Sequence, residues 1–181
     1  MTDIDLTLNP VDLLTVDAIG KPGSRVFYIQ GRKGDQTVSL LIEKIQLQSL
    51  IMGINDFLDE IADRYKTLPE IETDFQEDAM HIAPPVDPLF RVGDMGLAYD
   101  ESDDLVCIIA KENPADGEEK DLGGGVVRYW CTRAQLLALA DWAVMVIKRG
   151  RPICPQCGEP MEPEGHFCPK KNGHKKNAPL Q

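Results

Sequence analysis

A chain of 181 residues, 43% hydrophobic and 27% charged, is long enough for one hydrophobic core or for a domain with a small appendage. Its 30 acidic and 19 basic residues give a net charge of −11, which disfavours non-specific nucleic-acid binding because phosphate repels an acidic surface. No apolar run reaches the ~18–20 residues of a membrane span, and the first residues lack the basic and apolar segments of a signal peptide. We therefore expect a cytoplasmic protein.

The first part of the chain predicts three strands followed by a helix. Residues 1–10 are polar, and we expect them to lack regular structure. Three runs of β-branched and aromatic residues follow, separated by short glycine-containing turns that predict antiparallel pairing. These strands are expected at residues 11–19, 25–30 and 37–42. Apolar residues then recur at helical spacing from Leu47 to Tyr65, which predicts an amphipathic helix that ends before Pro69.

The same pattern recurs in the second part of the chain. Residues 67–88 are acidic and contain several prolines, so they predict a surface linker, in which we expect His81 to face solvent. Strands are then expected at residues 90–99, 105–110 and 126–131, with an acidic, glycine-rich loop at 111–125 and a helix at 134–147. Thr132 and Gln135 have the spacing of a capping box. This second helix is apolar on nearly every face, so we expect it to be the more buried of the two.

Together these elements predict an α+β fold built from two related antiparallel β-meander-plus-helix units. The first unit would span residues 1–66 and the second residues 89–150, with the linker 67–88 between them and a metal-binding tail at 151–181. The sequence Lys-Ile-Gln before the first helix resembles Arg-Ala-Gln before the second, with a leucine four residues after each glutamine. This similarity suggests an internal duplication in which the units share one core.

The tail contains a sharp chemical signal. Cys154 and Cys157 stand in a Cys-Pro-Gln-Cys-Gly run, which is typical of a tight turn that presents two thiolates to a metal ion. Cys168 supplies a third sulfur, and His166 and His174 compete for the fourth position. Four such ligands make a closed tetrahedral Zn²⁺ site that contributes folding energy rather than catalysis.

Other interpretations of the cysteines stay open. The cysteines of the tail could form a disulfide or remain free thiols, and a site with Cys154, Cys157 and Cys168 alone would leave a position for a catalytic water. A thioredoxin-type redox motif fits poorly, because that motif opens a helix after a strand. Cys107 and Cys131 lie in strand-like runs, and we expect them to be buried, reduced thiols.

The rest of the chain offers weaker candidates for a site. Residues 91–96, Arg-Val-Gly-Asp-Met-Gly, are polar and glycine-rich, so a ligand could approach the backbone there, although a bulged strand is the more common explanation of such glycines. Glu43 and Lys44, at the start of the first helix, could pair with Arg133 across the repeat. The triple glycine at 123–125 lacks the Lys-Ser/Thr of a phosphate-binding loop. With three histidines and no recognisable catalytic set, the sequence does not favour an enzyme.

The chain resembles an uncharacterised bacterial family of the actinobacterial type, domain-of-unknown-function family 3090. The residues that carry the resemblance are Pro22-Gly23, Phe27-Tyr28-Ile29-Gln30, Glu43-Lys44, 90–100, Gly150-Arg151-Pro152, 154–158, 163–169 and Asn172-Gly173. Members of that family carry an aromatic residue where His174 stands here, so the resemblance implies Cys154, Cys157, His166 and Cys168 as the zinc ligands. Genes of the family occur near those of a phosphatase-like and a phosphoinositide-kinase-like protein, which implies a link to a phosphorylation system.

Residues and resemblance together predict a zinc-binding, non-enzymatic interaction or adaptor protein with a protein partner. The alternative is an enzyme or regulatory subunit with a small-molecule pocket between the two repeats, near residues 91–96 and Glu43-Lys44. A third hypothesis is nucleic-acid binding through the tail, because residues 148–181 hold seven Lys and Arg against three Glu. We do not expect this third role, given the acidic body of the protein.

Overall fold

The computed structural model of the protein describes residues 4–73, 75–113, 124–161 and 166–172. Its seven strands are β1 (Asp5–Leu8), β2 (Leu13–Ile19), β3 (Val26–Lys33), β4 (Gln36–Ile42), β5 (Pro88–Asp100), β6 (Leu105–Glu112) and β7 (Val126–Thr132). The helices are α1 (Lys44–Arg64), η1 (Glu77–Met80), α2 (Arg133–Lys148) and α3 (Pro169–Asn172). In this order, three strands and a helix follow one another twice, from β2 to α1 and from β5 to α2. The prediction of an α+β fold is therefore confirmed at this level.

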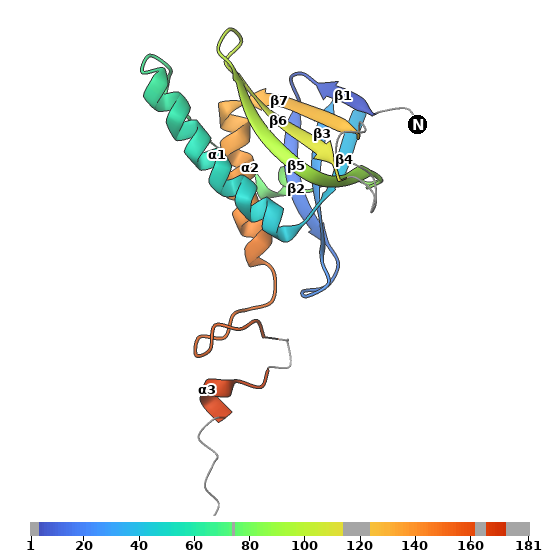
Figure 1. The fold of residues 1–181 in the computed structure, drawn as a ribbon, viewed down its shortest axis with the longest axis vertical. Coiled ribbons are helices and arrows are strands. Elements are labelled where there is room, and N and C mark those ends of the chain that lie inside the picture. The colour runs from blue at the N-terminus through green and yellow to red at the C-terminus, as the bar shows by residue number, and fades with distance from the viewer. Residues whose placement is uncertain (1–3, 74, 114–123, 162–165, 173–181) are drawn as a thin grey trace, which may run out of the picture.

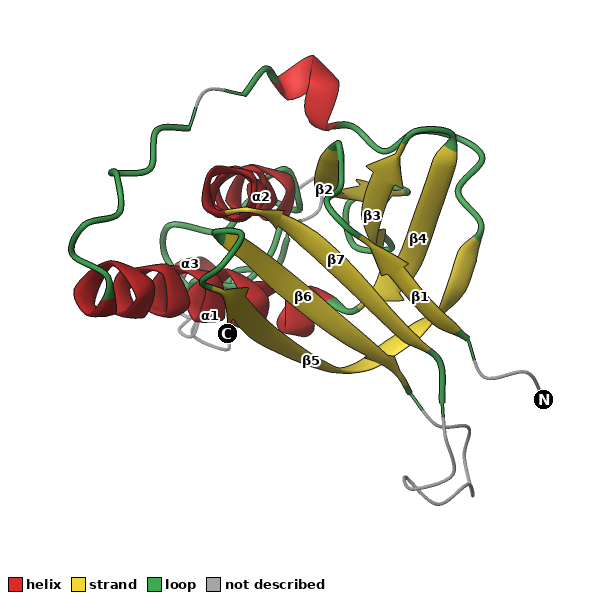
Figure 2. Ribbon diagram, turned by 90° about the horizontal axis from the view of Figure 1, so that it is seen from above, coloured by secondary structure: helices red, strands yellow, loops and turns green. Residues whose placement is uncertain are grey.

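All seven strands belong to one mixed sheet in the order β1-β7-β6-β5-β4-β3-β2. Within each meander the pairing is antiparallel, as expected, but β5 joins β4 in parallel, and β1 joins β7 in parallel. Helices α1 and α2 pack side by side, and α2 also packs on β2 (Figures 1 and 2). Among the described residues, no helix is both long enough and apolar enough to cross a membrane.

Burial of the two helices follows their sequence patterns. The buried residues of α1 recur at three- and four-residue spacing from Leu47 to Ile61, so one stripe faces the core. In α2, seven of the 16 residues are buried, against five of 21 in α1, which confirms that α2 is the more buried helix. Trp142 of α2 is fully buried, and its indole N–H donates a hydrogen bond of 2.6 Å to the carbonyl of Val16 in β2. Helix α2 is thereby fixed against the edge strand β2.

Two segments differ from the expectations. The prediction that residues 1–10 lack regular structure is wrong, because Asp5–Leu8 form β1 and Leu8 is fully buried. Residues 67–88 are not only a surface linker, because part of this segment packs against the sheet. Met80 is buried, and its carbonyl accepts a hydrogen bond from the Thr15 hydroxyl. His81 is exposed, as expected, yet its Nδ1 lies 2.8 Å from a carboxylate oxygen of Asp17.

The sheet is strongly curved. Strands β7 and β3 are four positions apart in the strand order, but a Cβ added at Gly31 of β3 would lie 2.4 Å from the Tyr129 ring of β7. The Tyr129 hydroxyl donates to the carbonyl of Val38 in β4 at 3.2 Å. Distant strands therefore meet across the concave face of the sheet, where part of the core lies (Figure 2).

Candidate metal centre

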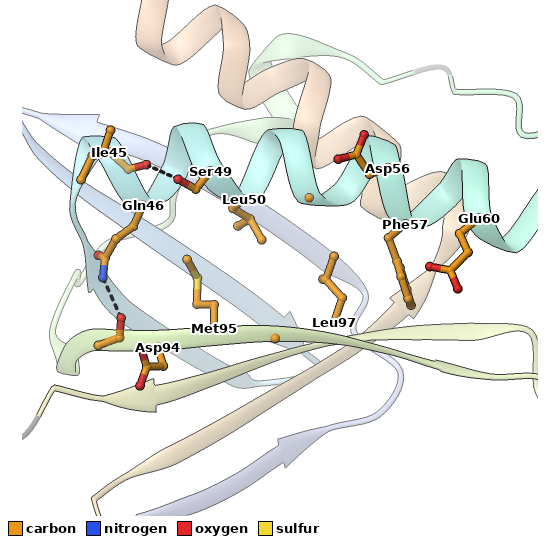
Figure 3. A pocket seen from close by; sticks show the side chains of 13 residues that line it. Ile45, Gln46, Ser49, Leu50, Asp56, Phe57, Glu60, Asp94, Met95 and Leu97 are labelled. Carbon is orange, nitrogen blue, oxygen red and sulfur yellow. Dashed lines mark hydrogen bonds between the residues drawn. The ribbon is translucent and has the colours of Figure 1, made fainter. Parts of the chain in front are cut away.

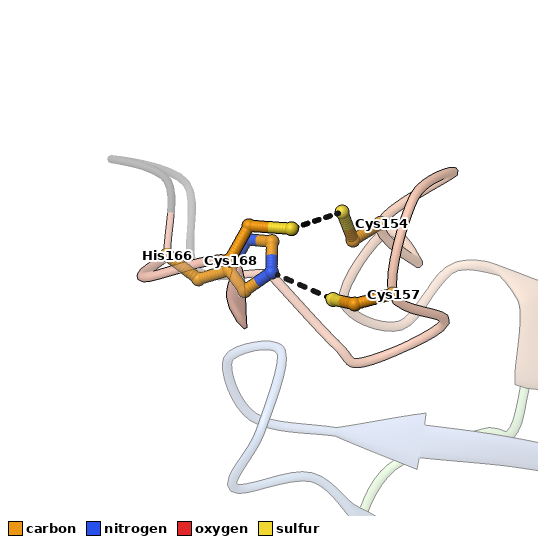
Figure 4. A group of neighbouring side chains, drawn as sticks. All are labelled: Cys154, Cys157, His166 and Cys168. Carbon is orange, nitrogen blue, oxygen red and sulfur yellow. Dashed lines mark hydrogen bonds between the residues drawn. The ribbon is translucent and has the colours of Figure 1, made fainter. Parts of the chain in front are cut away.

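The first two candidate ligands lie on a tight turn that follows α2. Ile153 and Pro160 form an antiparallel bridge, and the N–H of Cys154 donates to the carbonyl of Glu159 at 2.8 Å. The N–H of Gly158 donates back to the carbonyl of Cys154 at 2.9 Å, and Gly158 has a φ of 79°, which glycine adopts without strain. These bonds close the turn and hold the side chains of Cys154 and Cys157 on the same side of it (Figure 4).

The other two candidate ligands come from the segment just before α3. His166 and Cys168 face the turn, and the ligand atoms of all four residues lie within 4.8 Å of one another (Figure 4). The Sγ atoms of Cys154 and Cys168 are 3.9 Å apart, and the Sγ atom of Cys157 is 3.1 Å from Nε2 of His166. The structure thus brings together the four residues that the sequence and the resemblance indicated, while His174 lies outside the described residues.

The spacing of the Cys154 and Cys168 sulfurs fits a metal ion better than a disulfide. Zinc–sulfur bonds of about 2.3 Å in a tetrahedron place two sulfurs about 3.8 Å apart, close to the 3.9 Å observed. A disulfide requires about 2.05 Å, and all five cysteines are free. Three sulfurs and one imidazole nitrogen are a donor set that suits tetrahedral Zn²⁺.

Thiol acidity distinguishes Cys154 from the two cysteines of the sheet and also from Cys157, whose pKa is raised by burial and by the neighbouring sulfurs of Cys154 and Cys168. Backbone N–H groups of Cys157 and then Gln156 point at the Cys154 sulfur and lower its pKa to about 7, which favours the thiolate that a metal requires. Burial raises the pKa of the Cys107 thiol to about 11 and that of the Cys131 thiol to about 12. These two residues are buried, reduced thiols within the sheet, as predicted.

The turn between β2 and β3 anchors the point where the tail leaves the body. The Arg25 guanidinium donates to the carbonyls of Val146 and Ile147 at 2.7 and 3.2 Å, which satisfies the end of α2. A Cβ added at Gly23 would lie 3.2 Å from the Arg151 side chain, so the turn and the start of the tail are in close contact. Neither contact was predicted from the sequence, because residues more than 100 positions apart make them.

The second candidate region forms a groove between α1 and β5. Its volume is about 540 Å³, and residues 93–97 line one wall (Figure 3). The sequence pattern did not reveal the contact that Gln46 of α1 makes with β5, where its Nε2 donates to the carbonyls of Val92 and Gly93 at 3.1 and 2.9 Å. Gln46 is the third residue of α1, a position at which glutamine commonly caps a helix, so the sequence offered no reason to expect a contact with β5.

The expected pairing of Glu43 with Arg133 is wrong. Glu43 instead forms an ion pair with Arg91 at one end of the groove. Arg133 pairs with Asp104, its Nε lying 2.7 Å from the carboxylate. The β5–β6 turn brings Asp104 to the start of α2, where its carboxylate pairs with Arg133. Of the triple glycine, Gly125 is described and donates its N–H to the Glu112 carboxylate at 2.8 Å, while residue 123 lies outside the described residues.

Comparison with known proteins gives a family but no function. The profile of a family described as "Protein of unknown function (DUF3090)" matches residues 6–168, which include the sheet, both long helices and all four clustered residues of the tail. No curated protein matches the chain. No solved structure matches it either.

Proposed function

Because the chain belongs to the DUF3090 family, whose description assigns no function, we propose a role from the site itself: a zinc-binding, non-enzymatic interaction protein in which zinc is structural. The observation that carries this proposal is the cluster of Cys154, Cys157, His166 and Cys168, with their ligand atoms within 4.8 Å of one another. Four protein ligands fill a tetrahedral shell, so substrate and water have no open position on the ion.

The tail needs such an ion because it buries little else. Among its described residues, only Cys154 and Cys168 are buried. Structural zinc contributes about 10–16 kcal/mol of apparent binding free energy in zinc-finger peptides, and this binding is coupled to folding. The bound ion would hold the turn at 154–158 against the segment 166–168 and fix the side chains beside them.

Two of those neighbouring side chains are apolar and exposed, which supports a docking role. Ile153 is 58% exposed and precedes Cys154, while Phe167 is 76% exposed and lies between His166 and Cys168. Exposed apolar residues on an ordered support are typical of protein interfaces. The partner is therefore a protein rather than nucleic acid, in keeping with the acidic body of this chain.

The organisation predicted from the sequence is part of the proposal. The units 1–66 and 89–150 would derive from one duplicated ancestor and be joined by residues 67–88, with residues 151–181 as the metal-binding appendage. The repeated order of three strands and a helix supports a duplication. A reduced Cys3His set also suits the bacterial cytoplasm, where thiols stay unoxidised.

A second candidate function rests on the groove between α1 and β5. Its volume of about 540 Å³ falls within the range of about 300–1,000 Å³ that is typical of small-molecule sites. The protein would then be an enzyme or a regulatory subunit, linked to a phosphorylation system. The described lining contains no histidine, cysteine or lysine, and the hydroxyl of Ser49 is bonded to the carbonyl of Ile45. These residues favour binding over catalysis.

Metal analysis of the reduced, full-length protein tests the proposal. We expect about one zinc ion per chain, and its loss in Cys157→Ser with a fall in amide protection across 151–161. Cys107→Ala is the matched control, since this thiol lies in the sheet and should leave the zinc content unchanged. Metal-free protein with an equally protected tail would contradict structural zinc, and an exchangeable water on the ion would favour a catalytic metal.

A further inference from the structure

One edge of strand β5 has no partner strand over most of its length among the described residues. Strand β4 pairs with β5 only near its start, through Ser39 with Pro88 and Leu41 with Arg91. Beyond Arg91, β6 continues to pair with one edge of β5 up to Asp100, but no described strand pairs with the opposite edge. In an extended strand, every second residue directs its N–H and C=O to the same edge. Part of the β5 backbone, at the edge beside the groove, is therefore not paired with any described strand.

One side chain already hydrogen-bonds to this edge in place of a strand. Gln46 donates to the carbonyls of Val92 and Gly93, at the point where a bulge between Val92 and Met95 interrupts the register with β6. From there to Leu97 the groove is lined by consecutive residues of β5. Five residues from 93 to 97 span about 13 Å at about 3.3 Å per residue, enough for a short added strand.

The opposite wall of the groove leaves room for such a strand. Leu50 and Phe57 of α1 point toward Met95 and Leu97 of β5, which gives the groove an apolar floor (Figure 3). Gly53 also lines the groove, and a Cβ added there would meet no atom within 4 Å. A helix-interior glycine costs about 1 kcal/mol relative to alanine. Packing within the described protein does not require this glycine, so the space beside it is available to a partner.

The charges at the groove define the partner. Asp56, Glu60 and Asp94 are among the lining residues, and none of the described lining residues is basic. Glu60 pairs with Arg64 at 3.0 Å, whereas Asp56 and Asp94 form no ion pair with any described residue. Asp56 lies on α1, and the Asp94 carboxylate points away from α1 on the far side of β5 (Figure 3). An added strand would have acidic groups near both of its faces.

We propose that the groove binds an extended peptide of alternating apolar and basic residues, which adds to the open edge of β5 as a further strand. Its apolar side chains enter the space between Phe57 and Leu97, and its lysine or arginine side chains meet Asp94 on the other face and Asp56 at the rim. Its backbone satisfies the β5 groups that β4 leaves unpaired. This inference rests on the proposed role as an interaction protein, but not on the metal.

A ten-residue peptide of alternating valine and lysine is the probe. We expect saturable binding in fluorescence anisotropy, together with slower amide exchange in residues 93–99 of the full-length protein. A peptide with glutamate in place of lysine should not bind, because like charges repel. A fully N-methylated peptide keeps the side chains but lacks the amide donors, so it should not bind either.

Three variants of α1 locate the binding. Asp56→Lys should weaken the affinity about three- to tenfold, since it reverses one exposed charge of the groove. Asp59→Lys is the matched control: it makes the same charge change on the same helix, but residue 59 lines a different cavity, so the affinity should stay the same. Gly53→Leu places a side chain in the groove, so it should reduce the affinity about tenfold or more while the protein stays folded.

Several results would overturn the inference. The first is that the valine–lysine peptide does not bind, or that the glutamate or N-methylated peptide binds equally well. Another is that Asp56→Lys and Asp59→Lys weaken the affinity equally. A third is that the peptide slows amide exchange outside β5 instead of within it. A small molecule that co-purifies in the groove and is displaced by Gly53→Leu would also overturn it. Zinc content is measured on the same samples so that the two proposals can be told apart. A metal-free protein that still binds the peptide would contradict only the structural-zinc proposal. A protein that contains zinc but does not bind the peptide would contradict only the proposal that the groove binds a peptide.

Discussion

At the scale of single residues, Asp104 makes contacts that the sequence pattern did not reveal. It lies in the β5–β6 turn at a φ of 49°, where it accepts a hydrogen bond of 2.9 Å from the Tyr99 hydroxyl. Nε and Nη2 of Arg133 lie 2.7 and 3.0 Å from its two carboxylate oxygens, and the Arg133 side chain is only 8% exposed. The turn is thereby fixed to the first residue of α2. Removal of this carboxylate would leave a nearly buried guanidinium without its charge partner.

We predict that Asp104→Asn lowers the free energy of unfolding at pH 7 by about 1–2 kcal/mol. Asparagine tolerates a positive φ, so the variant tests the charge rather than the backbone. Arg133, as donor, holds the pKa of the Asp104 carboxyl below its ordinary value. A lowered pKa contributes stability above the ordinary value of about 3.9 and loses it as the pH falls through the folded-state value. Urea unfolding at pH 7 and pH 3 should therefore show a difference that shrinks in acid, and a constant difference would rule out the ion pair as its cause.

At the scale of elements, the sequence predicted the helices and strands that depend on interactions between residues close together in the chain. Both long helices and six strands were found near their expected positions, because periodicity and turns specify them. Strand β1 and the packing of residues 67–88 were missed, since each depends on a partner far along the chain, β7 for the first and β2 for the second. The four clustered residues of the tail were predictable for the same local reason: they lie within 15 consecutive residues. The groove was not, because α1 and β5 form it from separate parts of the chain.

The capping box at the start of α2 was predicted from local sequence, and its contribution to the stability of the protein can be measured. The Thr132 side chain accepts from the N–H of Gln135 at 3.1 Å, and the Gln135 side chain accepts from the N–H of Thr132 at 2.9 Å. Thr132→Ala removes one partner, so we predict a loss of about 1 kcal/mol in the free energy of unfolding, measured with urea. Thr132→Ser keeps the hydroxyl and should lose much less. Equal losses would mean that the threonine methyl group, and not the cap, is responsible.

At the scale of the whole molecule, a parallel strand pair joins the two meanders, and the curvature of the sheet brings their far strands together. The parallel contact of β4 with β5 makes one sheet of them, and the curl then brings β7 back toward β3. No local sequence pattern indicates the parallel pairing of β4 with β5 or the curvature of the sheet. The sequence therefore predicted two antiparallel meanders but not how they combine into one sheet. Where β7 approaches β3, the Tyr129 ring packs against Gly31 and leaves no room for a side chain at that residue.

This contact predicts a large penalty for a single methyl group. A Cβ at residue 31 would lie 2.4 Å from Cδ1 of Tyr129, which is fully buried and held by its bond to Val38. Gly31→Ala should therefore lower the free energy of unfolding by about 1–3 kcal/mol, as overpacking does in cores. Gly53→Ala is the control, because its Cβ meets nothing within 4 Å and alanine favours a helix, so stability should rise by up to about 1 kcal/mol.

A double-mutant cycle with Tyr129→Leu identifies the cause, with each free energy taken from urea unfolding. The smaller side chain costs stability itself, but it frees the space that a methyl group at position 31 would need. The penalty of Gly31→Ala should then fall to about a few tenths of a kcal/mol in that background. If the full penalty persists beside leucine, the glycine is required by the local conformation of β3 and not by the ring of Tyr129.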